Sequence, residues 1–310
     1  RPNSIDNAPL FVYQIEMTMR KNVLCFFTLL LLIGSLVSCT KSSKKELWVY
    51  TSMYKEMIEQ MKPDVQKAFP ELTVQWFASG SEKVGAKINA ELAANSLQAD
   101  ILMTSDPFFY MKLKQDGLLA AYESPNAKNI PPILKDADGY FSTQRVPVMV
   151  IAYNRTMISP SEAPQTFQDL PEKKWKGKVA MGSPLESGTT FTAVATLAQK
   201  YGWDYFKKLR ENETFSAGGN SSVREKLEAK EYPVGIILLE NILQAQDQGS
   251  PLEAIYPTDG AILVPSPVAI FKRTKHLEEA KQFIDFLFSE IGQRAMITAK
   301  MYSPNPLVPP

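Results

Sequence analysis

The chain has 310 residues, in which 34 Lys and Arg nearly balance 33 Asp and Glu to give a formal net charge of +1. This balance leaves no basic surplus to bind a phosphate backbone, which argues against a nucleic-acid-binding protein. The two Cys and one His are too few for a zinc site made of Cys and His ligands.

The N-terminal residues have the three-part pattern of an export signal. Met17–Lys21 is positively charged, Val23–Ile33 is almost continuously apolar, and Leu36–Cys39 resembles a bacterial lipobox, in which the cysteine is lipidated. The apolar run is shorter than the roughly 20 residues that a transmembrane helix needs. We therefore expect a signal peptide, with an uncut signal anchor as the alternative. The expected segments are 1–18 upstream of the native start, 19–38 as lipoprotein signal peptide and 39–45 as tether, with Cys39 carrying the lipid.

Removal of this signal changes the chemistry available to the rest of the chain. From Cys39 onward the chain is formally neutral, and Cys39 is its only cysteine, because Cys25 leaves with the signal. No thiol then remains for catalysis, and no disulfide can form within the chain. Lys41, Lys44 and Lys45 suit an anionic lipid surface or, equally, an ordinary solvated linker.

The next hundred residues predict strands that alternate with helices. Each apolar or alternating run is followed by a segment with apolar residues at helical spacing. The predicted strands are 47–52, 72–77 and 100–104, and the predicted helices are 54–69, 82–95 and 107–115. Alternation of this kind is typical of a parallel sheet with crossover helices.

The second half of the chain predicts another α/β unit between two long strands that contain prolines. These strands, 145–154 and 261–271, suit edges or crossings better than a central ladder, because proline cannot donate a backbone hydrogen bond. Between them we expect strands at 175–181 and 234–239 and helices from 187, at 203–210 and at 220–229. A further helix is expected after the second long strand, at 277–288. We expect an α/β fold of two Rossmann-like lobes, 46–148 plus 262–310 and 149–261, joined by two hinge strands around a cleft.

The polar residues at the strand ends are the candidate binding residues. Hydroxyl groups that precede a helix cap it, and the free N–H groups beside them favour an anion. Ordinary capping explains any one such group, so the hypothesis depends on their convergence at one neutral, donor-rich cleft. The candidates are Thr51, Ser52, Tyr54, Ser79, Ser81, Ser105, Asp106, Ser187, Gly188, Thr189, Thr190, Asn220, Ser221, Glu240 and Asn241.

Two of these groups carry more specific expectations. In the turn Ser187–Thr190, Gly188 would let a ligand approach the backbone at a helix N-terminus. Glu240 follows a buried strand and would accept sugar hydroxyls or an ammonium, although a solvated surface carboxylate fits the pattern equally. Tyr54 and Asp106 are expected at the cleft rim, where packing or capping would also explain them.

Catalysis has little support in the sequence. Neither a Gly-x-Ser-x-Gly elbow nor a Gly-x-x-x-x-Gly-Lys-Ser/Thr loop occurs, and His276 starts a predicted helix away from the hydroxyl cluster. No general base for a serine nucleophile is apparent. We therefore expect no enzymatic activity, no cofactor and no metal.

With these residues in view, positions 46–305 resemble the type II periplasmic solute-binding proteins of ABC transporters. The similarity is to the branch that holds ferric-iron, hexose-phosphate and phosphonate binders. The most specific stretches are Asp259–Lys272, Glu279–Leu287 and Gly292–Arg294, supported by Val49–Ser52, Ala99–Met103, Trp175–Val179 and Ser187–Thr190. The resemblance implies a non-enzymatic, exported lipoprotein, periplasmic or on the cell surface, that works with permease and ATPase subunits.

The departures from the family pattern bear on the ligand. Iron binders of this family place a Tyr-Tyr pair where this chain has Leu238–Asn241, and their iron-binding His falls at or near Tyr54. The resemblance therefore implies a small organic anion, phosphorylated or a phosphonate, held by a monomer that closes about its hinge. The alternatives are an Fe(III) receptor and a ligand-sensing input protein of a signalling system. The chain stops soon after Pro306, and we expect it to lack the family's final helix.

Overall fold

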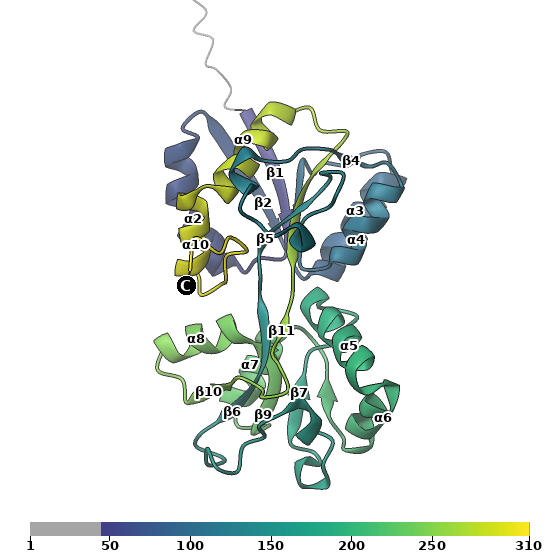
Figure 1. Cartoon of the computed structure of the whole chain (residues 1–310), viewed down its shortest axis with the longest axis vertical. Helices are drawn as coiled ribbons and strands as arrows, with labels where there is room; N and C mark the ends of the chain where they lie inside the picture. Colours follow the sequence, from purple (N-terminus) through teal and green to yellow (C-terminus); the bar gives the residue numbers. More distant parts are fainter. Residues whose placement is uncertain (1–44, 310) are drawn as a thin grey trace, which may run out of the picture. The chain divides into compact units, whose positions relative to one another are not determined.

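The computed structural model describes residues 45–309 (Figure 1). The predicted signal peptide, the lipidated Cys39 and all of the tether before Lys45 lie outside the described residues. Within 45–309, no helix has both the length and the apolar character that crossing a membrane requires. The described part folds around two sheets, and we call each sheet with its helices a lobe.

The first lobe is built on a mixed sheet with strand order β2-β1-β3-β12-β4, in which β5 also pairs with β12. β1 is parallel to β2 and β3, as the alternation of strands and helices predicts, and β12 is antiparallel. The strands are β1 (Lys45–Thr51), β2 (Leu72–Ala78), β3 (Ile101–Met103), β4 (Leu119–Ala120), β5 (Ser142–Arg145) and β12 (Ser266–Phe271).

Helices cover both faces of this first sheet. One face packs against α2 (Lys55–Ala68), α9 (Leu277–Phe288) and α10 (Glu290–Thr298), through residues such as Met61 and Phe283. The other face packs against α3 (Ser81–Ala93) and α4 (Pro107–Gln115), through Ile88 and Tyr110. Burial on both faces explains why the central strands β3 and β12 are mostly apolar, with little alternation.

The second lobe repeats this architecture. Its sheet has the order β10-β6-β9-β7-β8, with β11 paired to β6, and α5 and α6 lie on the face opposite α7 and α8 (Figure 1). The strands are β6 (Val148–Asn154), β7 (Val179–Met181), β8 (Phe215–Ser216), β9 (Val234–Leu238), β10 (Leu252–Ile255) and β11 (Ile262–Leu263). The helices are α5 (Gly188–Tyr201), α6 (Trp203–Glu211), α7 (Asn220–Glu228) and α8 (Leu239–Asp247), and the 3₁₀ turns of this lobe are η3 (Phe167–Asp169) and η4 (Lys173–Trp175). The first lobe has two further 3₁₀ turns, η1 (Pro125–Ala127) and η2 (Pro132–Leu134).

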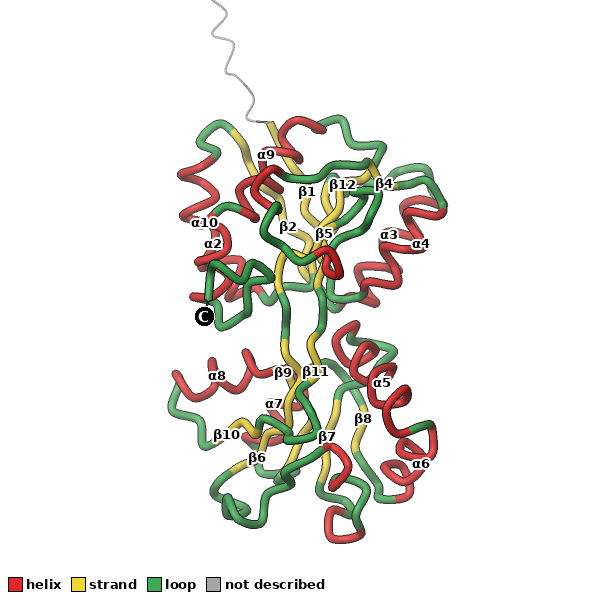
Figure 2. Tube along the Cα trace, viewed as in Figure 1, coloured by secondary structure: helices red, strands yellow, loops and turns green. Residues whose placement is uncertain are grey.

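Two extended segments run between the lobes (Figure 2), and in each of them the strand is interrupted at a proline. The prediction of two unbroken strands, 145–154 and 261–271, is therefore wrong. β5 gives way to β6 at Pro147 and β11 gives way to β12 at Pro265, because proline removes a ladder donor. The segments remain hydrogen-bonded to each other, since the Val264 amide donates to the Pro147 carbonyl at 2.9 Å. This paired crossing has the form of a hinge.

The end of β9 differs from the prediction in a way that matters for the site. The strand ends at Leu238, not at 239, and α8 begins at Leu239. Glu240 and Asn241 therefore lie in the first turn of a helix. The continuous apolar run obscured this start, although Leu239, Ile242 and Ala245 have helical spacing and are all buried.

Candidate functional site

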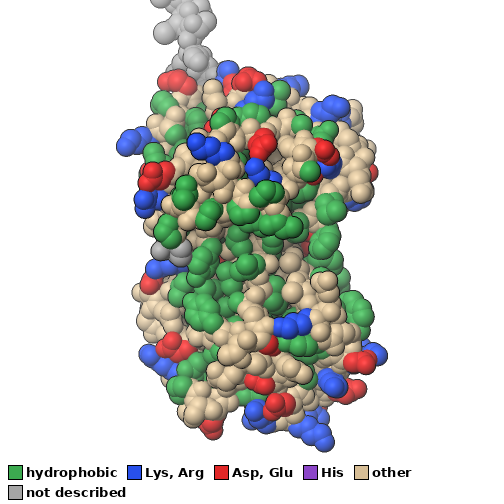
Figure 3. Space-filling model, viewed as in Figure 1, with side chains coloured by type: hydrophobic (Ala, Val, Ile, Leu, Met, Phe, Trp, Pro, Cys, Tyr) green, Lys and Arg blue, Asp and Glu red, His purple; other side chains and the backbone are tan. Residues whose placement is uncertain are grey.

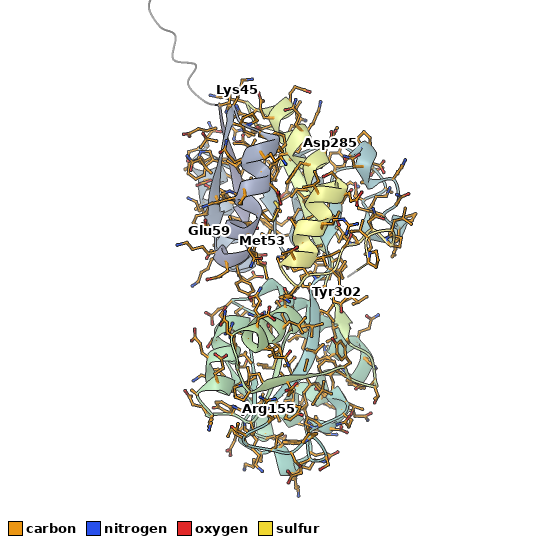
Figure 4. The ribbon with its side chains drawn as sticks, turned by 90° about the vertical axis from the view of Figure 1, so that its left-hand side faces the viewer. Lys45, Met53, Glu59, Arg155, Asp285 and Tyr302 are labelled. Carbon is orange, nitrogen blue, oxygen red and sulfur yellow. The ribbon has the colours of Figure 1, made fainter. Side chains whose placement is uncertain are left out.

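A cavity of about 320 Å³ lies between the two lobes. It takes residues from the carboxyl ends of β1, β2 and β3 in the first lobe, and from the segments after β7, β8 and β9 in the second. Met53, one of the lining residues, lies at the end of the first lobe that faces the second (Figure 4). The volume is in the range of small-molecule sites.

Helix N-termini converge on this cavity. α2, α3, α5, α7 and α8 each begin with residues that line it: Lys55, Ser81, Gly188, Asn220 and, one residue into the helix, Glu240. The first N–H groups of an α-helix have no partner within the helix, and the helix dipole makes this end positive. Convergence of this kind favours a bound anion.

The structure brings together most of the predicted site residues. Those that line the cavity are Ser52, Tyr54, Ser79, Ser81, Ser105, Ser187, Gly188, Thr189, Asn220, Ser221 and Glu240. Those that do not line it are Thr51, Asp106, Thr190 and Asn241. The first group comes from strand ends and helix starts, as the sequence predicted.

The four other residues have structural contacts beside the cavity. The Thr51 hydroxyl accepts from the Met53 amide at 3.0 Å, and Asn241 accepts from the Tyr54 hydroxyl at 3.2 Å. Asp106 caps α4 by accepting from the amides of Phe108 and Phe109, and burial raises the pKa of its carboxyl. Thr190 donates its backbone N–H to the Ser187 hydroxyl oxygen at 3.3 Å. Capping and support therefore account for these positions.

Arg145 and Glu240 form a buried pair of opposite charges at the cavity. The side chains of Arg145, at the end of β5, and Glu240, on α8, are 3% and 2% exposed. Their nearest nitrogen and oxygen are 3.8 Å apart, which is an ion pair but not a hydrogen bond. Arg145 also donates to the Ser105 hydroxyl oxygen at 3.1 Å.

This pair is incompletely satisfied within the described protein. Arg145 Nε and Glu240 Oε1 are buried and have no hydrogen-bond partner among the described residues. Burial raises the pKa of Glu240 to about 7 although the charge of Arg145 lowers it, and burial also lowers the pKa of Arg145. Unsatisfied buried groups beside a cavity are placed to bind a ligand, because leaving them unpaired costs free energy.

Tyr54 supplies a phenol hydroxyl, not a phenolate, to the same cavity. Burial and the charge of Glu240 raise its pKa to about 12, so the hydroxyl keeps its proton at neutral pH. The hydroxyl groups of Ser187 and Thr189 lie 3.0 Å apart across the start of α5. The neutral side chains of the cavity can therefore donate hydrogen bonds as well as accept them.

Sequence reasoning missed the charged part of the cavity. Lys55, Lys83 and Arg145 line it, together with Glu186, so the prediction of a neutral cleft made of hydroxyl and amide donors is wrong. The feature that could have pointed to Arg145 as a site residue is its position as a charged residue just before the buried apolar run of β6. The remaining lining residues that were not predicted are Met53, Ala78, Gly80, Gly219 and Leu238.

The donor set does not suit a metal ion. Residues 45–309 contain no group of three or more His, Cys, Asp or Glu side chains placed to hold one. The cavity's acidic residues are Glu186, which accepts from the Gly218 amide at 3.0 Å, and Glu240, which faces Arg145. Fe(III) requires several hard anionic donors together, and of the two carboxylates here one already accepts from a backbone amide and the other faces a fixed positive charge.

Comparison with known proteins identifies relatives over most of the chain. A model of the family "Bacterial extracellular solute-binding protein" matches residues 97–310. An uncharacterized protein of Haemophilus influenzae is 28% identical over 89% of this chain and 82% of its own length. A probable ABC transporter periplasmic-binding protein of Sinorhizobium fredii is 27% identical over 62% of this chain and 56% of its own, so this chain spans little more than half of it.

Solved structures with the same fold include both anion and iron binders. The periplasmic binding protein AfuA from Actinobacillus pleuropneumoniae, solved with exogenous fructose-6-phosphate bound, is 29% identical, with a TM-score of 0.75 over 85% of this chain and 86% of that one. Iron-bound HitA from Pseudomonas aeruginosa is 22% identical, with a TM-score of 0.74 over 84% of this chain and 87% of that one, which shows the fold alone. The predicted fold class, two α/β lobes of the type II periplasmic binding kind, is confirmed.

Proposed function

This chain belongs to the bacterial extracellular solute-binding proteins, which are non-enzymatic transport components, and we propose that it is the receptor of an ABC importer for a small phosphorylated organic anion. The ligand class is a sugar phosphate or a phosphonate. Solute-binding proteins of ABC transporters bind a small ligand and work with permease and ATPase subunits. The proposed role is therefore capture of the anion outside the membrane and its delivery to those subunits.

The observation that carries this proposal is the convergence of helix N-termini on one cavity. The starts of α3, α5 and α7 offer backbone N–H groups beside the hydroxyls of Ser81, Ser187, Thr189 and Ser221. Oxygen atoms of a phosphoryl group accept hydrogen bonds from such donors, and the helix dipoles favour its charge. Lys55, Lys83 and Arg145 add positive charge to the same cavity.

The remainder of the ligand would meet polar groups that can both donate and accept. Glu240 Oε1 is an unpaired acceptor, and Arg145 Nε is an unpaired donor beside it. A ligand hydroxyl can donate to the first and accept from the second. The Tyr54 hydroxyl, held by its hydrogen bond to Asn241 outside the cavity lining, lies next to this pair and would orient the ligand. This arrangement supports a polyhydroxylated, sugar-like body attached to the phosphoryl group.

Ligand screening by thermal shift tests the proposed function. A ligand that binds only the folded state raises its stability by mass action. We expect fructose 6-phosphate, other sugar phosphates or phosphonates to raise the melting temperature, and inorganic phosphate to do so less. A shift with Fe(III) alone would replace the proposal with an iron receptor. If ligand binding to the protein changed the activity of a signalling partner and no transport occurred, a sensory role would be supported instead.

Alanine substitution at the start of α5 is expected to weaken anion binding. Ser187→Ala with Thr189→Ala removes two hydroxyls at the cavity, and one neutral hydrogen bond contributes about 0.5–1.5 kcal/mol. The double variant should therefore bind fructose 6-phosphate roughly 5- to 100-fold more weakly by calorimetry. Thr196→Ala is the matched control, because Thr196 lies further along α5, does not line the cavity, and donates its hydroxyl to the Thr192 carbonyl of the same helix. Unchanged affinity in the double variant would remove these hydroxyls from the site.

We further propose that the protein is exported and held at a bacterial membrane by lipid on Cys39. The lipobox-like Leu36–Cys39 follows an apolar run and a positive segment, which supports cleavage before the cysteine. Cys39→Ser is expected to move the protein from the membrane fraction to the soluble fraction and to abolish metabolic labelling with a fatty acid. Persistence of the labelled, membrane-bound form would refute lipidation at this position.

A further inference from the structure

The segment that follows α10 is fastened to the crossing strand on both sides of Arg145. The side-chain amide of Gln293 on α10 donates to the Gln144 carbonyl at 3.2 Å, and the Val146 amide donates to the Tyr302 carbonyl at 2.9 Å. Figure 4 shows Tyr302 at the level where the two lobes meet. Because the backbone is held both before and after Arg145, the direction of the Arg145 side chain depends on this segment.

Met301 lies in the same segment and contacts the Arg145 guanidinium directly. Arg145 Nη1 donates to the Met301 sulfur at 3.2 Å, and Nη2 donates to the Ser105 hydroxyl oxygen at 3.1 Å. Met301 is 1% exposed and does not line the cavity. It therefore meets the guanidinium from the side of the protein core, and it can act on a ligand only through Arg145.

The sulfur is a weak acceptor for this guanidinium, and a stronger acceptor lies nearby. The same Nη1 atom is 3.8 Å from Glu240 Oε1, which is too far for a hydrogen bond. A carboxylate is a strong acceptor for an arginine, whereas a thioether sulfur is a weak one. An arginine free to choose its partner would therefore turn toward Glu240. Here the segment after α10 holds Arg145 toward Met301 instead.

The same segment also contacts the helix that carries Glu240. Tyr302 packs against a buried cluster that includes Leu239, which directly precedes Glu240 at the start of α8. At the other end of α8, Asp247 pairs with Lys300 at 3.0 Å. One short segment thus contacts the elements that carry both members of the buried ion pair, and it fixes the spacing between them.

From these contacts we infer that Met301 is a positioning residue of the binding site, whose sulfur holds the Arg145 guanidinium away from Glu240 so that the two charged groups do not satisfy each other. A ligand then meets an arginine donor and a carboxylate acceptor side by side. The inference rests on the proposed function, because that function assigns Arg145 and Glu240 to the ligand. Met301 contributes to binding although it does not touch the ligand itself.

Replacement of Met301 by leucine tests the role of the sulfur, because it removes the acceptor and nearly conserves the volume. Arg145 can then turn to Glu240, so we expect the affinity for fructose 6-phosphate to fall about 3- to 10-fold by calorimetry. Met301→Gln offers an amide oxygen instead and should bind within about twofold of the unsubstituted protein. Met296→Leu is the matched control, because Met296 is equally buried in the same core cluster. Equal affinities of Met301→Leu and Met296→Leu would contradict the inference.

A double-mutant cycle separates positioning from packing. If Met301 acts through Arg145, adding Met301→Leu to Arg145→Met should change the affinity by less than about 1.5-fold, because the coupled partner is already gone. A further loss as large as that in the single variant would show that Met301 acts by packing alone, and the inference would be wrong.

Titration of Glu240 by NMR gives a readout that needs no ligand. Its carboxyl signal is assigned in protein with ¹³C-labelled glutamate by comparison with Glu240→Gln. Burial raises the pKa of Glu240 to about 7, and the charged or titratable side chains that face it are Arg145 and Tyr54. A closer guanidinium favours the carboxylate, so Met301→Leu should lower the titration midpoint to about 6. Met296→Leu and Met301→Gln should leave it at about 7.

The two readouts fail separately. An unchanged titration midpoint in Met301→Leu would overturn the inference, whatever the ligand is. If fructose 6-phosphate binds neither the unsubstituted protein nor the variants, the proposed ligand is wrong, and the titration of Glu240 still decides whether Met301 positions Arg145.

Discussion

Replacing Arg145 with methionine is expected to weaken the binding of fructose 6-phosphate by roughly 10- to 100-fold while the fold stays intact. Arg145 is the buried cation of the cavity, and a hydrogen bond to a charged group contributes about 1.5–3 kcal/mol. Its side chain lines the cavity, and its Nε has no hydrogen-bond partner among the described residues. Calorimetric titration of both proteins measures the difference.

The fold tolerates this substitution because Glu240 can take up a proton. Removing one partner of a buried ion pair is usually costly, since the other charge is left unpaired. Here the pKa of Glu240 is already raised to about 7, so near neutral pH its protonation adds less than about 1 kcal/mol to the cost. Ser105, which loses a donor, keeps its hydrogen bond from Ser266 at 2.7 Å.

The rim lysines provide a graded control for this prediction. Lys55 and Lys83 line the same cavity but are exposed, so water screens their charges. Lys83→Met should weaken binding by no more than about fivefold. Arg145→Lys should fall between the two, because it keeps the charge but loses the planar fork. Equal losses for Lys83→Met and Arg145→Met would show that binding responds to net charge and not to the buried guanidinium.

The sequence predicted the site well wherever a residue's role depends on its position at the end of an element. Ser52, Ser79 and Ser105 follow β1, β2 and β3, which are parallel, so their ends meet at one edge of the sheet. Ser187 was predicted as a helix cap, and its hydroxyl does accept from the Thr190 amide. Local pattern determines such residues, and topology then brings them together.

The residues that were missed depend on contacts between distant segments. Arg145 is local to β5, but its burial comes from Ser105, Met301 and Glu240, which are far away in the chain. Gly188 was predicted to admit a ligand, and the structure adds a second reason for glycine, which is the approach of Ser81 and Ser105. The periodicity of a single sequence indicates local secondary structure, and it does not indicate which residues of one lobe contact the other lobe.

The lobe boundaries predicted from the sequence remain a prediction, although the sheets show what determines the crossing. The first sheet is formed by the strands up to Arg145 and by β12, which begins at Ser266. All strands of the second sheet lie within 148–263. On the face shown in Figure 3, charged side chains cover the two ends, and hydrophobic side chains gather across the middle, where the crossing segments run. Pro147 and Pro265 mark the two crossings because each one interrupts a ladder.

Stability of the unsubstituted protein is expected to fall as the pH rises from 5 to 8, and Glu240→Gln should remove that part of the fall. Burial raises the pKa of Glu240 from 4.5 to about 7 in the folded protein. A carboxyl whose pKa is raised by folding contributes its full stabilisation only while it is protonated in both the folded and the unfolded state. Its contribution is thus complete below about pH 4.5 and is lost progressively as the pH rises to about 7.

The size of this effect follows from the shift itself. A change of one pKa unit corresponds to about 1.4 kcal/mol, so the whole shift is equivalent to about 3 kcal/mol, most of it lost between pH 5 and pH 8. Denaturant titrations at the two pH values measure it, and the informative quantity is the difference between Glu240→Gln and the unsubstituted protein. This difference should move by about 2–3 kcal/mol in favour of glutamine as the pH rises.

A pH-independent offset between the two proteins would not affect this result. Glutamine leaves its own amide to be satisfied, and this cost is the same at pH 5 and pH 8. The attraction to Arg145 acts only on the ionised carboxylate and is already included in the pKa of about 7. Glu186→Gln is the control, because Glu186 lines the same cavity without facing Arg145. If the two glutamine variants had parallel pH profiles, Glu240 would be ionised throughout, and its unpaired oxygen could then bind only donors of the ligand.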